Sequence, residues 1–373
     1  MLLLRNSTKT STRLVLPYEI RLHTAHRDEQ LTRLVAEAFA LNQQSLRIQP
    51  LTGGLSNSLF VAYHQQQPVA LIRVHPDPPP NNSRLHHSKH HPPPFIDHRT
   101  ETKLLRWLSQ QHHLAPKLYG SFQNGRLEEF YPHHQPLSSC RDMIKYAPLI
   151  AQRMAQLHAL PQEIVTISCQ ERTRQWLTLA ESLVVSHEKE LTPLLQTLQH
   201  EWQWIESVLF HTTSAATPAQ SFLAQRVLTH GDLQSLNVLV HQEDPTDVRI
   251  IDYEYASYSP RGFDLANTFC EYCDMNHLRA DYEREYPTTT EQKEFLRSYL
   301  HTLGQPIPSE EYLQELGDQV GRYTVVSHIS WAIWSIVQHF QSAQRETFDY
   351  LQYARHRLEG NAFSKRRFWD LES

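Results

Sequence analysis

The sequence has few cysteines, no long apolar run and no block of basic residues, and each absence excludes a class of protein. Four cysteines in 373 residues do not suggest the disulfide framework of a small secreted domain. No apolar run reaches the roughly 18–20 residues that a membrane-spanning helix needs. The net charge is −5 without a long basic stretch, so nothing supports a nucleic-acid partner or stable membrane insertion.

The N-terminus and the composition favour a cytoplasmic protein. Met1-Leu2-Leu3-Leu4-Arg5 becomes polar at once, which a secretory signal does not do. Apolar residues make up 40% of the chain and charged residues 20%, as in soluble globular proteins. A length of 373 residues is enough for two lobes with a large core.

Two groups of potential metal ligands are better explained without a metal. Cys270-Glu271-Tyr272-Cys273 is formally a CxxC motif, but no second CxxC accompanies it and its flanks have a helical pattern. We therefore expect two reduced thiols on one helical face. Residues 75–98 hold six histidines among proline runs, which resist both helix and sheet. This segment is predicted to be a flexible surface insertion, and its role is open.

The first third of the chain has the periodicity of a small sheet with two helices. Residues 1–27 are expected to form an N-terminal tail. Helices are predicted over 28–42 and 99–111, and strands over 46–51, 58–64, 69–74, 118–122 and 126–131. The last two strands form a hairpin, because Asn124-Gly125 is a typical turn between them.

The rest of the chain is predicted to be mainly helical, apart from short strands near residues 228 and 250. Helical patterns cover 140–160, 171–186, 190–210, 261–276, 288–302, 309–340 and 346–360, with a polar link over 211–220. There is no internal repeat. We therefore predict an α+β fold of two lobes. The small antiparallel-sheet N-lobe spans residues 28–131, and the larger helical C-lobe spans residues 132–373.

The most informative segment is Leu228-Thr229-His230-Gly231-Asp232-Leu233-Gln234-Ser235-Leu236-Asn237, followed by Ile250-Ile251-Asp252-Tyr253-Glu254. This spacing is that of a kinase catalytic loop followed by a metal-binding Asp. Asp232 would accept the proton of the substrate hydroxyl or align it. Asn237 and Asp252 would supply oxygen ligands to Mg²⁺, and Glu254 could hold a second metal or its water. A capping turn and a strand-end carboxylate are the alternative, which the full spacing between strands disfavours.

A second group of residues is predicted to bind the nucleotide. Gly53, Gly54, Ser56 and Asn57 lie between two strands, where backbone N–H groups could approach a polyphosphate. A Gly-Gly hairpin turn would look the same, and the Walker arrangement is absent.

Further nucleotide contacts are expected around the end of the N-lobe. Arg73 ends a strand and could neutralise nucleotide phosphates, with Glu101 of the next helix holding it in place. Glu129 and Phe130 lie at the end of the last predicted N-lobe strand, where an adenine edge would meet the backbone. The alternatives are a solvent-facing Arg, a capping Glu and an ordinary edge strand.

An aromatic pair lies near the C-terminus. Trp331 and Trp334 are three residues apart and so share a helical face. Such a pair is usually core. An aromatic wall is also what an ammonium or quaternary ammonium ligand prefers, through cation–π attraction.

Taken together, these segments resemble the choline/ethanolamine kinase family, whose fold is similar to that of protein kinases. The resemblance runs from about residue 30 to 360. Its motifs are Leu51-Thr52-Gly53-Gly54-Leu55-Ser56-Asn57, Ala115-Pro116-Lys117-Leu118-Tyr119-Gly120, His230-Gly231-Asp232 with Asn237, Ile251-Asp252-Tyr253-Glu254-Tyr255, Arg261-Gly262-Phe263-Asp264-Leu265-Ala266-Asn267, Phe269-Cys270-Glu271 and Trp331-Ala332-Ile333-Trp334-Ser335-Ile336-Val337-Gln338. The last three are far more specific than the His-Gly-Asp motif.

The resemblance implies an ATP- and Mg²⁺-dependent kinase that phosphorylates a small amino alcohol. It carries the proton-accepting Asp onto Asp232 and the metal ligands onto Asn237 and Asp252. It also implies that His230 and Asp264 support the catalytic loop. The amino-alcohol site falls on Glu271, Trp331, Trp334 and Tyr353. Members of the family often dimerise, so a homodimer is an expectation.

The sequence departs from the family pattern at two places. Gly231 stands where the family often has Asn, although Gly occurs in related phosphotransferases. The segment Cys273-Asp274-Met275-Asn276 lacks the Tyr that choline kinases often carry. Choline and ethanolamine therefore both stay open as substrates. A related phosphotransferase for aminoglycosides or sugar amines, and a non-catalytic pseudokinase, are the alternative functions.

Overall fold

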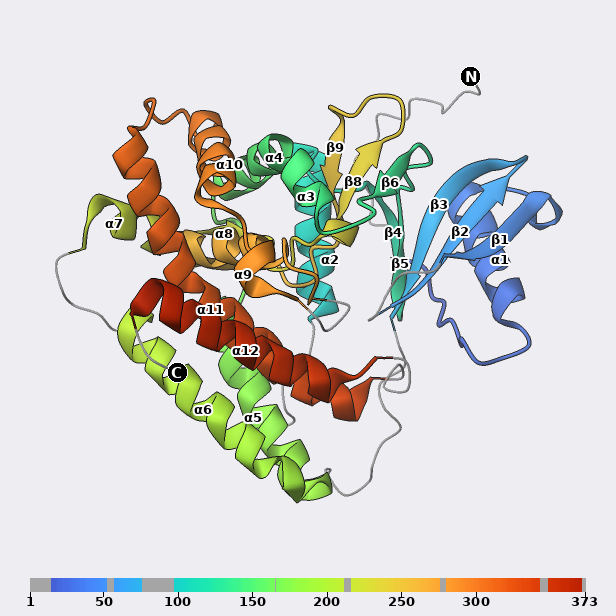
Figure 1. Ribbon diagram of the computed structural model, residues 1–373. Helices are drawn as coiled ribbons and strands as arrows, with labels where there is room; N and C mark the ends of the chain where they lie inside the picture. The colour runs from blue at the N-terminus through green and yellow to red at the C-terminus, as the bar shows by residue number, and fades with distance from the viewer. Residues whose placement is uncertain are drawn as a thin grey trace. The chain divides into compact units, whose positions relative to one another are not determined.

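The computed structural model describes residues 15–51, 57–75, 97–164, 166–210, 216–275, 280–342 and 348–370. The chain divides into two compact units. The first comprises residues 1–83 and 109–132, and the second comprises residues 84–108 and 133–373. Figure 1 labels their helices and strands. The loop with Gly53, Gly54 and Ser56, and most of the predicted insertion 75–98, lie outside the described residues.

The first unit is built on the predicted antiparallel sheet. Its strands run in the order β1 (Leu46–Leu51), β2 (Ser58–His64), β3 (Gln67–Val74), β5 (Gly125–Glu128) and β4 (Leu118–Phe122). Every neighbouring pair is antiparallel. Glu129 and Phe130, predicted as part of the last strand, follow its end.

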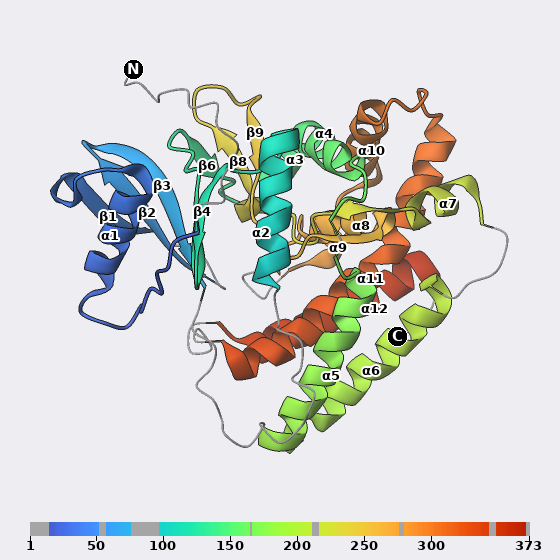
Figure 2. The same ribbon diagram turned by 180° about the vertical axis from the view of Figure 1, so that it is seen from behind.

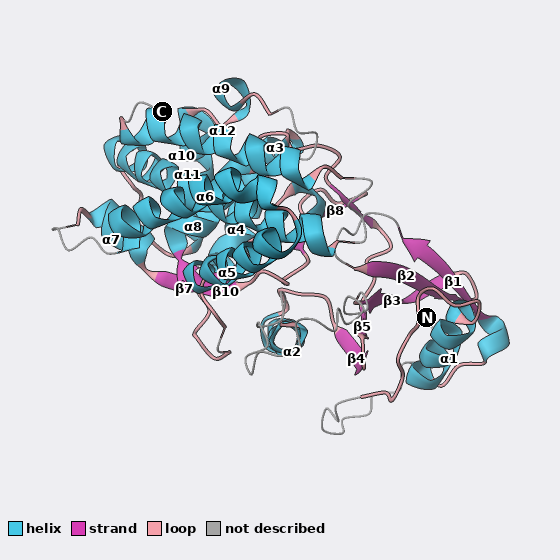
Figure 3. Cartoon of the chain, turned by 90° about the horizontal axis from the view of Figure 1, so that it is seen from below, coloured by secondary structure: helices cyan, strands magenta, loops and turns pink. Residues whose placement is uncertain are grey.

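Helix α1 (Arg27–Phe39) covers the sheet of the first unit (Figure 3). Its buried Leu31, Leu34 and Val35 pack in one core with apolar side chains of the sheet. Leu16 and Ile20 belong to the same core, and the Leu16 N–H donates to the Ser121 carbonyl over 2.9 Å. Residues 15–26 thus differ from the expected tail, because two apolar side chains anchor them.

The second unit is mainly helical, as predicted. Its helices are α2 (His98–Trp107), α3 (Asp142–Lys145), α4 (Ala147–His158), α5 (Cys169–His187), α6 (Thr192–Ile205), α7 (Pro218–Ala224), α8 (Arg261–Cys270), α9 (Tyr282–Glu285), α10 (Thr289–Thr302), α11 (Glu310–Gln341) and α12 (Tyr350–Trp369). Figure 2 shows them from behind. Among the described residues no helix is both long and apolar enough to cross a membrane.

Other boundaries also differ from the sequence-based expectations. Residues 84–108, including α2, group with the second unit although the N-lobe was expected to reach residue 131. The helix predicted over 140–160 is two helices, and Pro148 lies in the first turn of the second, where its missing N–H costs nothing. Helix α8 ends at Cys270 rather than at residue 276.

Helix α11 is the centre of the second unit. Every residue from Tyr323 to Val337 is buried, so this stretch is covered on all sides and not only on one face. It packs against α5, α6, α8, α10 and α12, and Figure 1 shows α12 running beside it.

Two small sheets hold the segments that the sequence singled out. β7 (Arg226–Thr229) pairs with β10 (Ser257–Pro260). β6 (His134–Pro136), β8 (Val238–His241) and β9 (Val248–Ile250) form a second sheet. The catalytic loop therefore leaves one sheet at Thr229 and enters the other at Val238. The β9–β10 loop makes the return crossing, so both loops are anchored at each end.

Candidate active site

The turn after β7 requires glycine. Gly231 has a φ of +83°, which side chains disfavour. A Cβ at this position would also lie 2.4 Å from the Tyr255 carbonyl oxygen. Gly231 is thus explained by the close approach of the catalytic loop (residues 230–237) to the segment before β10.

The first turn of α8 braces the catalytic loop through one buried carboxylate. The Asp264 Oδ1 accepts the Gly231 N–H and its Oδ2 accepts the His230 N–H, each over 2.8 Å. His158 Nε2 lies 2.9 Å from the same Oδ2. Although burial raises the pKa of Asp264, its hydrogen bonds, first the one with His158 and then the one from the Gly231 N–H, outweigh burial and lower the pKa overall. The loop backbone is therefore held by an ionised acid.

His230 joins the catalytic loop to the β9–β10 loop. Its Nε2 lies 3.0 Å from the Ile251 carbonyl oxygen, so Nε2 carries the proton and donates. Its Nδ1 then accepts the Asp232 N–H over 3.3 Å. Burial lowers the pKa of His230, which favours this neutral form.

Asp232 is oriented by Asn237. The Asn237 Nδ2 donates to the Asp232 carbonyl oxygen over 2.8 Å and to the Asp232 Oδ2 over 3.0 Å. Gln234 Nε2 also lies 3.5 Å from that Oδ2. Burial, and then the charges of Glu271, Asp252 and Glu254, raise the pKa of Asp232 well above its ordinary value. Four acids therefore share one electrostatic neighbourhood.

The β9–β10 loop brings Asp252 to the same place. The Ile251 N–H donates to the Asn237 carbonyl oxygen over 3.0 Å, which ties the two loops together. Asp252 has a φ of +69°, a conformation that costs a non-glycine residue about 1–3 kcal/mol. Asp252 and Glu254 are both half-buried. Strain of this kind is typical of functional positions.

The oxygen atoms around Asp232 suit a cation that is bound partly by the protein and partly by substrate and water. Among the described residues no three His, Cys, Asp or Glu side chains form a cluster that could hold a metal ion. The Asn237 side chain, however, donates from Nδ2 to Asp232, and no described residue donates a hydrogen bond to its side-chain Oδ1. Mg²⁺ usually takes one or two carboxylates with substrate phosphates and water, so Asn237, Asp252 and Glu254 fit it.

The two tryptophans of α11 belong to an aromatic cluster, which we define as Tyr255, Trp331, Trp334 and Tyr353. The ring centroid of Trp331 lies 5.3 Å from that of Trp334 and 5.0 Å from that of Tyr255. The Tyr353 ring lies 6.3 Å from that of Trp334. Each of the four side chains is more than 90% buried. Tyr255 is part of a sequence motif of the family, but the sequence alone does not predict that it belongs to the site.

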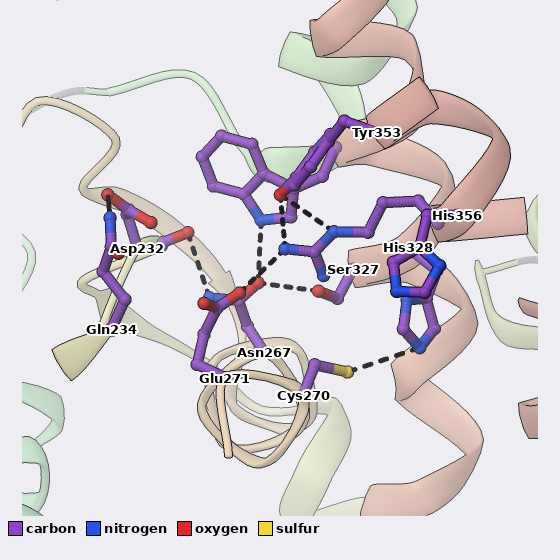
Figure 4. Close-up of polar contacts among 12 residues, drawn as sticks. Asp232, Gln234, Asn267, Cys270, Glu271, Ser327, His328, Tyr353 and His356 are labelled. Carbon is purple, nitrogen blue, oxygen red and sulfur yellow. Dashed lines mark hydrogen bonds and ion pairs between the residues drawn. The ribbon is translucent and has the colours of Figure 1, made fainter. Parts of the chain in front are cut away.

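Asn267 of α8 connects this cluster to the catalytic loop. Its Oδ1 accepts the Trp331 Nε1–H over 2.9 Å and the Ser327 hydroxyl over 2.7 Å. Its Nδ2 approaches the Gly231 carbonyl oxygen at 3.4 Å. Figure 4 shows the contact between Asn267 and Ser327. The sequence offered a signal for Asn267, because it lies three residues after Asp264 on the same helical face.

Glu271 is paired, which the sequence did not reveal. The Arg357 Nη2 donates to its Oε1 over 2.8 Å. Arg357 also donates to the Tyr353 hydroxyl oxygen from Nε over 2.9 Å and from Nη2 over 2.6 Å. The expectation of a carboxylate facing aromatic rings is thus modified by a buried cation. Arg357 lies four residues after Tyr353 on α12, and this spacing could have suggested the contact between Arg357 and Tyr353, although not the one with Glu271.

Cys270 and Cys273 are both free and buried, as expected for reduced thiols. The expectation that they share a helical face is wrong, because α8 ends at Cys270 and Cys273 lies beyond it. Burial raises the pKa of Cys270 to about 12.

Arg73, Asn57 and Glu129, three of the predicted nucleotide contacts of the first unit, make polar contacts within that unit. Arg73 is 4% exposed, and its Nε lies 3.2 Å from the Glu128 Oε1, so a solvent-facing Arg is excluded. The Asn57 Oδ1 lies 2.9 Å from His75 Nδ1. The Glu129 Oε2 accepts the Lys117 N–H over 3.2 Å, and Phe130 is half-buried.

Glu101, in the second unit, is buried, and its Oε2 lies 3.2 Å from His98 Nδ1. The expected pairing of Arg73 with Glu101 joins residues of different units and stays a prediction.

Comparison with known proteins gives one consistent family. The family model described as choline/ethanolamine kinase matches residues 48–361. "Probable choline kinase 2" of Arabidopsis thaliana is 32% identical over 73% of this chain and 75% of its own length. "Choline/ethanolamine kinase" of Homo sapiens is 29% identical over 85% and 79% of the two chains. A crystal structure of choline kinase from Cryptosporidium parvum covers 92% of this chain and 96% of its own, with a TM-score of 0.72 and 24% identity.

Proposed function

The chain belongs to the choline/ethanolamine kinase family, and from this membership we propose that it transfers the terminal phosphate of ATP to the hydroxyl of choline or ethanolamine. The product would be phosphocholine or phosphoethanolamine, the first intermediate of phospholipid synthesis from either alcohol. The observation that carries the proposal is Asn267, which hydrogen-bonds both to the catalytic loop and to Trp331. A phosphoryl-transfer loop and an aromatic cluster suited to a cation thus share one residue.

We propose that Asp232 takes the proton of the substrate hydroxyl. As the O–H bond breaks, the alcohol oxygen attacks the terminal phosphorus and the bond to the departing ADP oxygen breaks. A raised pKa makes Asp232 a stronger base than an ordinary carboxylate once it is ionised. The hydrogen bonds from Asn237 leave one carboxylate oxygen, Oδ1, free to face the hydroxyl.

Asn237, Asp252 and Glu254 would hold Mg²⁺. When bound, the ion would neutralise charge on the transferring phosphate. The backbone positions these ligands. The hydrogen bond from the Ile251 N–H to the Asn237 carbonyl oxygen joins the two loops that carry them.

The nucleotide contacts are proposed on Gly53, Gly54, Ser56 and Asn57, on Arg73 with Glu101, and on Glu129 and Phe130. Arg73 supports this best, because a buried arginine held by Glu128 presents a fixed charge to a phosphate. The homodimer expected from the family is tested separately by the sedimentation velocity of the purified chain.

The alternative functions have less support. An aminoglycoside or sugar-amine phosphotransferase does not require the aromatic cluster of Tyr255, Trp331, Trp334 and Tyr353. A pseudokinase would be expected to have lost Asp232, Asn237 or Asp252, and all three are present.

Transfer of labelled phosphate from ATP tests the proposal. We expect the purified chain with Mg²⁺ to phosphorylate choline, ethanolamine or both. Asp232→Asn should reduce kcat by ~10²–10⁴-fold while circular dichroism stays unchanged. Absence of transfer to either alcohol by the folded wild type would refute the proposed function.

A further inference from the structure

The aromatic cluster offers very few hydrogen-bond acceptors. The Tyr353 hydroxyl oxygen receives two N–H groups of Arg357, at 2.9 and 2.6 Å, so both of its lone pairs are used. The Tyr255 hydroxyl oxygen receives the Trp334 Nε1–H over 2.9 Å. The Asn267 Oδ1, beside Trp331, already accepts two donors. The rings therefore present π faces whose polar atoms are largely satisfied.

Glu271 is the acid of the expected amino-alcohol site, and Arg357 binds one of its two carboxylate oxygens. The Arg357 Nη2 donates to Oε1, whereas no described residue donates a hydrogen bond to Oε2 of Glu271. The two opposite charges form an ion pair, with side-chain exposures of 1% for Arg357 and 7% for Glu271. Figure 4 labels Glu271 and Tyr353, the two residues that this guanidinium joins by hydrogen bonds.

Arg357 is held in this position at a cost. Its Nη1 is buried and has no hydrogen-bond partner among the described residues. A buried guanidinium with an unsatisfied nitrogen destabilises the fold, so its presence here indicates a functional role. Because Glu271 and Tyr353 bind its other nitrogens, Arg357 cannot turn away to release their oxygens.

Ethanolamine and choline make opposite demands on such a surface. The primary ammonium of ethanolamine has three N–H donors and is strongly hydrated, so removing it from water without acceptors is unfavourable. The trimethylammonium of choline has no N–H donor. Its methyl surface is attracted to aromatic faces by cation–π and apolar contact.

We infer that Arg357 is a positioning residue that makes this enzyme selective for a fully N-methylated ammonium, so that choline is preferred to ethanolamine. The selectivity arises because Arg357 occupies the Tyr353 hydroxyl oxygen and one of the two Glu271 carboxylate oxygens, so fewer acceptors are left for a primary ammonium. The inference rests on the proposed function and names the substrate of that same site.

A methylation series tests the preference in the wild-type enzyme. The substrates are ethanolamine, N-methylethanolamine, N,N-dimethylethanolamine and choline, each assayed with ATP and Mg²⁺. We expect kcat/KM to rise with each methyl group, to at least ~10-fold for choline over ethanolamine, mainly through KM. A kcat/KM for ethanolamine equal to or above that for choline overturns the inference but leaves the proposed function intact. No phosphorylation of any of the four substrates would instead refute the proposed function.

A pair of arginine variants tests the residue. Arg357→Met frees the oxygens of Tyr353 and Glu271, so the ratio of kcat/KM for choline to that for ethanolamine should fall by ~5-fold or more. Arg322→Met is the control, because Arg322 bonds to the Phe368 carbonyl at the far end of α12. It should keep the wild-type ratio.

The substrate ratio separates a positioning role from a merely structural one, since general damage lowers both activities together. If Arg357→Met does not fold, Arg357→Lys replaces it. Lysine keeps a charge beside Glu271 but cannot supply the paired donors to Tyr353, so the ratio should still fall. A folded Arg357 variant with the wild-type ratio would show that another residue sets the preference.

Discussion

At the scale of single residues, the site depends on buried polar side chains that each bind several partners at once. Asp264 is the clearest case, because its two oxygens accept from two successive backbone N–H groups and from His158. A carboxylate can accept all three bonds, whereas the amide of Asn would place an NH₂ group opposite a donor. The loop geometry thus depends on the charge state of a residue that does not touch the proposed substrates.

Asp264→Asn should therefore lower both stability and activity. A lost bond to a buried donor costs about 1–3 kcal/mol. We expect urea unfolding to show a loss of that size and kcat for choline to fall at least ~10-fold. If the variant had wild-type kcat, Asp264 would not be needed to hold the catalytic loop.

Two variants of Trp331 test whether choline binding needs the aromatic face of this residue or only its volume. Trp331→Leu removes the π surface and should raise KM for choline by roughly 10-fold, since a desolvated cation–π contact is worth up to ~2 kcal/mol. Trp331→Phe keeps an aromatic face and should raise KM less. Equal KM values for the two variants would argue that Trp331 serves only as core packing.

At the scale of elements, α8 organises the site because its functional residues share one face. Asp264, Asn267 and Glu271 follow one another at spacings of three and four, the last at the end of the helix. They contact the catalytic loop, α11 and α12 in turn. A rotation or shift of α8 would therefore disturb the loop, Trp331 and Arg357 together.

The contact between α11 and α12 depends on a glycine. A Cβ at Gly360 of α12 would lie 2.4 Å from the His328 ring of α11 and 2.7 Å from Tyr282. Gly360→Ala should destabilise the fold by about 1–3 kcal/mol, because both rings are buried and cannot retreat. Thermal unfolding measures this.

Gly317→Ala on α11 is the matched control. Its nearest neighbour is the Gln292 Oε1 at 3.1 Å, and alanine favours a helix by about 0.5–1 kcal/mol over glycine. Its Tm should stay the same or rise. Equal losses in the two variants would mean that helix packing at Gly360 is not the cause.

At the scale of the whole molecule, buried neutral histidines make stability depend on pH. Burial lowers the pKa of His158, His230 and His328 in the folded protein. The unfolded chain then binds protons that the folded chain does not, so stability is lost as the pH falls below the unfolded value of about 6.5. The expected slope is up to ~1.4 kcal/mol per pH unit for each histidine.

Urea unfolding at pH 8.0 and 5.5 measures this loss. His328→Gln removes one of the three groups and should flatten the dependence, although it lowers stability at pH 8. Equal stability of the wild type at the two pH values would contradict the burial of these histidines as neutral groups.

Much of this architecture follows from local sequence. β1, β2 and β4 have the bounds that alternation and turn residues predicted, because strand patterns depend on neighbours in the chain. α12 extends beyond the predicted residue 360 to Trp369, because its last turns are stabilised by contacts with α11 and not by local pattern. The spacing of Asp232, Asn237 and Asp252 likewise predicted a phosphoryl-transfer loop, since one short loop must present all of these groups.

The sequence by itself determined the family, the kind of reaction and the helical second unit, because each follows from residue patterns that are local in the chain. Only the tertiary structure decided which polar groups are already used. Arg357 lies 86 residues from Glu271, and no local pattern reveals that their side chains pair in the core. Substrate preference depends on such long-range pairings, because the energy of binding an ammonium is set by the acceptors that remain free after folding.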